Sequence, residues 1–126
     1  KVVMVQPYVS AVDTVGETAV LVFGGVVSHA ARKDAILEVG GGVVNDLNSR
    51  MFVSAREAST EEVSLAEQVL SVVQGWGDEL LYARVDMLPG PVVIELEVTE
   101  PSLFLRHAPG SAERFAAAVR RALEPS

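Results

Sequence analysis

Residues 80–99, LLYARVDMLPGPVVIELEVT, decide the fold. Alternate residues of an extended strand share a face, so Arg84 and Asp86 point to one side of the first strand and the apolar residues between them point to the other. Pro89 and Gly90 suit the central positions of a type II turn, and a second strand with two acidic residues follows. The stretch therefore predicts an antiparallel hairpin with one acidic face, formed by the strands Leu80–Leu88 and Pro91–Thr99.

Three carboxylates share this acidic face: Asp86 on the first strand, and Glu95 and Glu97 on the second. The turn predicts that Asp86 lies opposite Val93 and that Arg84 lies opposite Glu95. Because acidic residues are depleted in strands, their repetition needs an explanation. One is a solvated face with an Arg84–Glu95 pair, and the other is a site for divalent cations, which prefer carboxylate oxygens. Periodicity leaves both open. Without a cation, the unpaired carboxylates are expected to repel, so that removing one leaves the fold intact.

The rest of the chain predicts an α+β fold with helices packed on one side of a largely antiparallel sheet. Ser59 and Glu62 have the spacing of a capping box, so a helix is expected from about Thr60 to Gln74. Ser111 is expected to cap a second helix. The other expected elements are a strand at Val2–Val9, a hairpin through Ala19–Ala31 that turns at Gly24-Gly25, a loop from Asp34 to Arg50 and a short strand at Arg50–Arg56.

Composition narrows the class of protein. The 126 residues allow a single domain, residues 1–126, and the 49% hydrophobic content is enough for a buried core. Ten basic residues against seventeen acidic ones give a net charge of −7, which disfavours nucleic acid and anionic membranes as partners. The sequence has no cysteine, so disulfides and thiolate chemistry are excluded, and no apolar run is long enough to span a bilayer. A cytoplasmic protein is expected.

The acidic hairpin resembles the metal-binding end of ATP-grasp ligases. Its Arg84-Val-Asp86 motif is followed by Glu95-Leu-Glu97 and then by a proline-containing turn, as in the glutathione synthetase-like and cycloserine-ligase-like branches. The resemblance implies the C-terminal part of an ATP-grasp fold. It also implies an enzyme that phosphorylates a carboxylate with ATP before an amine displaces the phosphate. The residues implied to bind Mg²⁺ are Asp86, Glu95 and Glu97, with two ions expected, Glu95 bridging them, and Mn²⁺ as an alternative.

Segments upstream are similar to other parts of the same family. Val5–Val9 resembles its adenine-linking strand, Gly16-Glu17 its acidic loop, and the run that ends at Lys33 its basic phosphate-contacting strand, while glycines 40–42 fall at its flexible loop. The resemblance implies that Lys33 and Arg84 are catalytic, with Lys33 contacting the phosphates. The residues implied to bind ATP are Gln6, Pro7, Tyr8, Val9, Glu17 and Lys33, with Glu17 on the ribose.

ATP-grasp enzymes also carry an N-terminal substrate domain and a subdomain that closes over ATP. Neither precedes Lys1, so the chain is expected to be a fragment that is inactive on its own. Its partners would be small-molecule carboxylate and amine substrates, and bare surfaces are expected to favour a homo-oligomer. Two alternatives stay open: a noncatalytic α+β interaction module with a solvated acidic face, and a degenerate ATP-grasp domain that only binds nucleotide.

Overall fold

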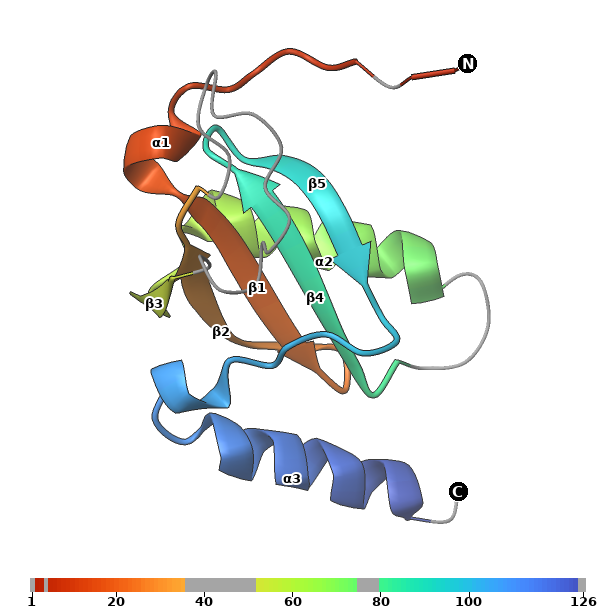
Figure 1. Cartoon of the computed structure of the whole chain (residues 1–126). Helices are drawn as coiled ribbons and strands as arrows, with labels where there is room; N and C mark the ends of the chain where they lie inside the picture. The colour runs from red at the N-terminus through yellow and green to blue at the C-terminus, as the bar shows by residue number, and fades with distance from the viewer. Residues whose placement is uncertain (1, 4, 36–51, 75–79, 125–126) are drawn as a thin grey trace.

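The chain folds around a five-stranded antiparallel sheet with the strand order β3-β2-β1-β4-β5 (Figure 1). The computed structural model describes residues 2–3, 5–35, 52–74 and 80–124. The predicted α+β class and antiparallel sheet are confirmed. The elements in chain order are α1 (Val12–Val15), β1 (Glu17–Phe23), β2 (Val26–Lys33), β3 (Val53–Arg56), α2 (Thr60–Gln74), β4 (Tyr82–Leu88), β5 (Val92–Glu97), η2 (Leu105–His107) and α3 (Ser111–Leu123).

α2 covers one face of the sheet, whereas α3 lies across the end of the strands, beside the turn between β1 and β2 (Figure 1). On one face, Val20 of the central strand packs with Ala66 of α2 in the buried core. On the other face, the ring of Phe23 lies 5.1 Å from the ring of Phe115 in α3. Because both faces are covered there, β1 is apolar and buried throughout its central part. α3 covers one end of its face and leaves the other end free for polar residues.

The first turn of α2 forms as its sequence predicts. The Ser59 N–H donates to the Glu62 carboxylate at 2.7 Å, and the Glu62 N–H donates to Ser59 Oγ at 3.2 Å, which is the reciprocal pair of a capping box. The same carboxylate accepts from Thr18 Oγ1 at 2.6 Å and from Arg56 at 3.0 Å. Burial alone would raise the pKa of Glu62, but these donors outweigh it and hold the pKa below its ordinary value. The cap therefore ties α2 to β1 and β3.

The register of the β4–β5 hairpin differs from the prediction. Met87 pairs with Val93, one residue later on β5 than a two-residue turn at Pro89-Gly90 would give. A bulge then shifts the register by one more residue, so that Asp86 pairs with Glu95. The extra residue is Ile94. The predicted partner of Asp86, Val93, is therefore wrong. The bulge also puts Val93 against the core, while Ile94 lies 43% exposed.

Both predicted turns lie where the sequence places them, although the second has three residues, 89–91, between the paired Leu88 and Val92. Gly24 and Gly25 have φ of 54° and 77°, and Gly90 has φ of 95°, values that glycine adopts without steric cost. The described residues of Val2–Val9 do not form the predicted strand, and the chain enters the short helix α1 instead.

Ser111 does not cap α3 as predicted. Gly110 is the N-cap residue, and the Ser111 hydroxyl donates to the Leu105 carbonyl at 2.9 Å, which fixes η2 against the helix. The predicted strand at Arg50–Arg56 is observed from Val53 onwards. Most of the predicted loop, including glycines 40–42, lies outside the described residues.

Candidate functional site

Six charged side chains form a row across the face of the sheet opposite α2, here called the charged row. Its members are Glu17, Lys33, Arg84, Asp86, Glu95 and Glu97. Asp86 on β4 is 0% exposed, and its carboxylate accepts from Lys33 Nζ at 2.6 Å and from Arg84 Nε and Nη2 at 2.8 and 3.0 Å. Glu17 at the start of β1 lies 2.8 Å from the same ammonium. Lys33 is on β2, so it must cross β1 to reach Asp86. It can do so because the β1 residue opposite Asp86 is Ala19, whose small side chain leaves room.

Both cations of this row are held in their charged forms. Burial lowers the pKa of the Lys33 ammonium, but its hydrogen bonds to Asp86 and Glu17 outweigh burial and raise the pKa above the ordinary value. The same balance, with Asp86 as the main partner, raises the pKa of Arg84. The expectation that the carboxylates are unpaired without a metal is therefore wrong for Asp86.

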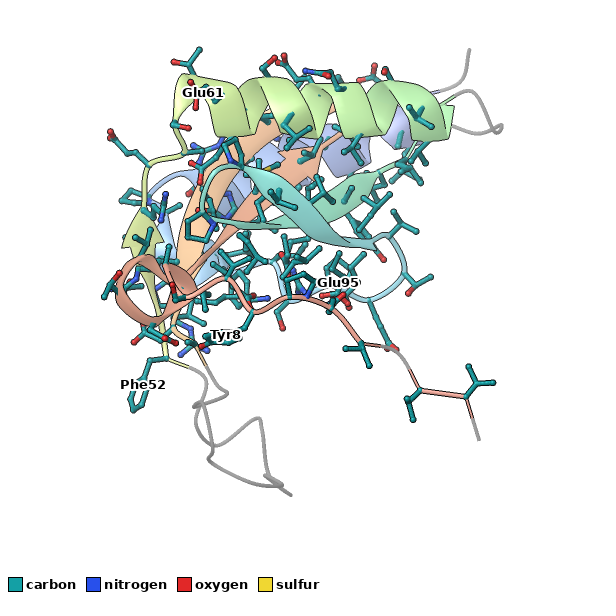
Figure 2. The ribbon with its side chains drawn as sticks, turned by 90° about the horizontal axis from the view of Figure 1, so that it is seen from above. Tyr8, Phe52, Glu61 and Glu95 are labelled. Carbon is teal, nitrogen blue, oxygen red and sulfur yellow. The ribbon has the colours of Figure 1, made fainter. Side chains whose placement is uncertain are left out.

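The Arg84 guanidinium also gathers the acidic side chains of β5. Its Nη2 lies 2.5 Å from Glu97 and 3.5 Å from Glu95. Glu97, not the predicted Glu95, is the cross-strand neighbour of Arg84. Asp86, Glu95 and Glu97 nevertheless lie on one face with Arg84 and Lys33, as the alternation predicts. Figure 2 shows Glu95 on the side of the sheet opposite α2.

The row carries an excess of negative charge, because two cations contact four carboxylates. The Glu95 and Glu97 side chains are 55% and 28% exposed, while both Asp86 oxygens are hydrogen-bonded to cations. Within the described ranges, no three His, Cys, Asp or Glu residues are already arranged around a metal position. The donor set nevertheless suits a hard divalent cation in its chemistry. Glu95 is available as it stands, whereas Asp86 has to release one contact with Lys33 or Arg84.

Phe104 is also part of the site, which no motif of the sequence predicts. Its ring lies over Arg84, with 5.6 Å between the guanidinium carbon and the ring centroid. The same ring lines a cavity of about 440 Å³, together with Val53, Ser102, Leu103 and Arg106. A larger cavity of about 510 Å³ is lined by His29, Glu57 and His107, among others, and by no residue of the charged row. Because Phe104 both contacts Arg84 and lines the first cavity, this cavity is the one that adjoins the charged row.

The residues predicted to meet adenine lie in the N-terminal segment. Gln6, Pro7 and Tyr8 are exposed, and Val9 is half-buried. Their described contacts are to α1 and its surroundings, not to the charged row: the Tyr8 hydroxyl donates to Asp13, and the Val9 carbonyl accepts from the Val12 N–H at 3.0 Å. Figure 2 places Tyr8 on the same side of the sheet as Glu95.

Comparisons with known proteins identify relatives of this chain over most of its length. No family model matches the chain. Over 130 residues, the chain is 39% identical to the cycloserine biosynthesis protein DcsG of Streptomyces lavendulae, a match that covers 98% of this chain and 43% of DcsG. The crystal structure of D-cycloserine synthetase DcsG matches with a TM-score of 0.81 at 38% identity, over 94% of this chain and 42% of that one. The chain is a homologue of DcsG.

A second solved structure shares the fold with the DcsG homologue. D-alanine–D-alanine ligase from Bacillus anthracis, in complex with ATP, matches with a TM-score of 0.50 at 18% identity, over 82% of this chain and 35% of the ligase. The predicted resemblance to ATP-grasp ligases is confirmed over part of their length, since the chain spans less than half of DcsG and of this ligase. None of the helices in the described residues has the length and apolar character needed to cross a membrane.

Proposed function

We propose that the chain is the C-terminal part of the catalytic domain of an ATP- and Mg²⁺-dependent ligase, which joins a carboxylate to an amine through an acyl phosphate. The observation that carries the proposal is the match to DcsG over 98% of the chain, because it includes all strands that hold the charged row. ATP is bound in the structure of the more distant D-alanine–D-alanine ligase. By the same reasoning, the substrates are small carboxylates and amines.

The carboxylates of the charged row would hold the divalent ions. Glu95 and Glu97 support this role because they are accessible and carry the excess negative charge. Asp86 would join them once a contact with Lys33 or Arg84 is released. When bound, Mg²⁺ or Mn²⁺ would neutralise the charge that develops on the transferred phosphoryl group.

The cations of the row would bind and orient the anionic reactants. Lys33 and Arg84 keep their charge, because their pKa values are raised, so each can donate to phosphate or acyl-phosphate oxygens. Glu17, which now pairs with Lys33, would accept from the ribose hydroxyls. The exposed backbone of Gln6–Val9 would meet the adenine.

The rival interpretation of a noncatalytic module with a solvated acidic face is less well supported. A solvated face would leave its charges in water, but Asp86 is fully buried and Arg84 is 8% exposed. Burying charges is costly unless they are paired, so a face that only has to stay solvated does not account for the burial of Asp86 and Arg84. A domain that only binds nucleotide remains an outcome of the test below.

Titration of the chain with Mn²⁺, followed by electron paramagnetic resonance, tests the cation site directly. We expect Glu95→Gln to weaken Mn²⁺ binding. Glu61→Gln is the matched control and should leave Mn²⁺ binding unchanged, because Glu61 is exposed on the opposite side of the sheet. Calorimetry with ATP should show weak binding and no turnover by the chain alone. Equal Mn²⁺ affinity in both variants would contradict the assignment, as would a submicromolar affinity for ATP without other domains.

A further inference from the structure

Phe104 has a backbone conformation that is unusual for its side chain. Its φ is 48° and its ψ is 31°, and within the described residues it is the only one other than glycine with a positive φ. A bulky residue in this left-handed region carries a steric cost, which a fold tolerates where the surrounding contacts hold it in place. The structure therefore has to maintain this conformation against strain.

Three hydrogen bonds fix the segment around Phe104. A ring nitrogen of His29, Nε2, lies 3.0 Å from the Leu103 carbonyl, and the His107 N–H donates to the Phe104 carbonyl at 2.9 Å. The Ser111 hydroxyl donates to the Leu105 carbonyl at 2.9 Å. The donors and ring nitrogen lie on β2, η2 and α3, and the accepting carbonyls belong to three consecutive residues, 103–105. Three elements therefore determine the path of this short segment.

The strained conformation places the ring against Arg84. The guanidinium carbon lies 5.6 Å from the ring centroid, within the range of a cation–π contact. The edge of the same guanidinium donates to Asp86 and Glu97 and approaches Glu95. A planar group that is covered on one face and bonded along its edge has little freedom to rotate.

We propose that Phe104 is a positioning residue, whose ring fixes the Arg84 guanidinium in the orientation that gathers the three carboxylates. Part of this proposal, the importance of the carboxylates for cation binding, rests on the proposed function. The contact between Phe104 and Arg84 does not, and it can be tested separately.

Hydrogen exchange of the Arg84 Nε–H, followed by NMR and assigned with Arg84→Lys, reports on the orientation of the guanidinium. In Phe104→Leu we expect exchange to accelerate about tenfold, because the cation–π contact and its shielding are lost. Phe104→Tyr, which keeps the ring, should restore slow exchange. The matched control is Phe115→Leu, which loses an aromatic ring that packs on Phe23 and Tyr82, away from the charged row.

A second variant separates the ring from the strained backbone. Asn tolerates a positive φ better than Phe, so Phe104→Asn removes the ring and relieves strain. We expect it to accelerate Arg84 exchange as Phe104→Leu does, even if Phe104→Leu proves too unstable to measure. Unchanged exchange in Phe104→Asn, or equal acceleration in Phe115→Leu, would overturn the proposal.

Mn²⁺ titration of the same variants then addresses the consequence for the site, because Arg84 competes with a cation for the carboxylate of Asp86. A Mn²⁺ affinity that changes in Phe104→Leu and Phe104→Asn, but not in Phe104→Tyr and Phe115→Leu, would support the positioning role at a working cation site. If the unaltered chain binds no Mn²⁺, the proposed function fails, while the exchange rates still decide whether Phe104 positions Arg84.

Discussion

The Asp86 carboxylate lies 2.6 Å from the Lys33 ammonium, although β1 separates the strands that carry these two residues. The ion pair bridges β1 at Ala19, and both side chains are nearly or fully buried. The charged row is therefore part of the structural core of the polar face as well as its proposed reactive centre. Its members should differ in their effects on stability according to their burial.

Asp86→Asn should destabilise the fold by about 3–5 kcal/mol, because it leaves two buried cations without their shared partner. Glu95→Gln should cost less than about 1 kcal/mol, since Glu95 is 55% exposed and lies 3.5 Å from Arg84. Urea unfolding of both variants measures the difference. Equal stability of the two variants would show that burial of the row contributes little.

Gly16→Ala should destabilise the fold more than Gly90→Ala does. Both glycines have a positive φ, which is expected to cost an alanine about 1 kcal/mol in backbone strain. Gly16 also has a ψ of −175°, a combination that essentially only glycine adopts. At Gly16, an added Cβ would lie 2.5 Å from the Lys33 carbonyl oxygen, whereas at Gly90 nothing lies within 4 Å. Thermal unfolding of the pair tests this. The same melting temperature in both variants would contradict the close approach of Gly16 to the strand that carries Lys33.

Glu62 should contribute a stability that depends on pH. Its pKa in the folded protein is below the ordinary value of 4.5, so the stabilisation is fully present above pH 4.5 and is lost as pH falls through the folded pKa. The difference in unfolding free energy between the unaltered chain and Glu62→Gln should therefore shrink from pH 7 to pH 3. A difference that stays constant over this range would show that the Glu62 charge is not what stabilises the α2 cap.

Self-association should depend on the outer face of the edge strand β5. Val92 and Ile94 are 52% and 43% exposed there, and an apolar edge strand can pair with another chain. Ile94→Lys should lower the fraction of dimer seen by analytical ultracentrifugation. A strictly monomeric unaltered chain at high concentration would rule out this association.

Local sequence rules predict the elements that depend on neighbouring residues. The capping box of Ser59 and Glu62, the turn at Gly24-Gly25 and the antiparallel hairpin are of this kind, because short-range hydrogen bonds and glycine geometry determine them. Strand alternation likewise predicts that Asp86, Glu95 and Glu97 share a face.

Local sequence rules do not predict the features that depend on tertiary packing. The three-residue connection from Leu88 to Val92 and the bulge at Ile94 together change the cross-strand partners of Asp86 and Arg84, and no local motif predicts the bulge. The pairing of Lys33 with Asp86 needs the strand order β2-β1-β4, and the role of Phe104 depends on contacts from His29 and Ser111. None of these relationships is local in the sequence.

ATP-dependent ligation by Glu95→Gln, compared with Glu61→Gln in the intact protein, is the most direct test of the account. The carboxylate at Glu95 would hold divalent ions, while Glu61 is exposed on the far side of the sheet (Figure 2). We predict that Glu95→Gln loses ATP-dependent product formation at unchanged stability and that Glu61→Gln retains it. Full ligase activity in Glu95→Gln would contradict the assignment of the charged row as the catalytic metal site.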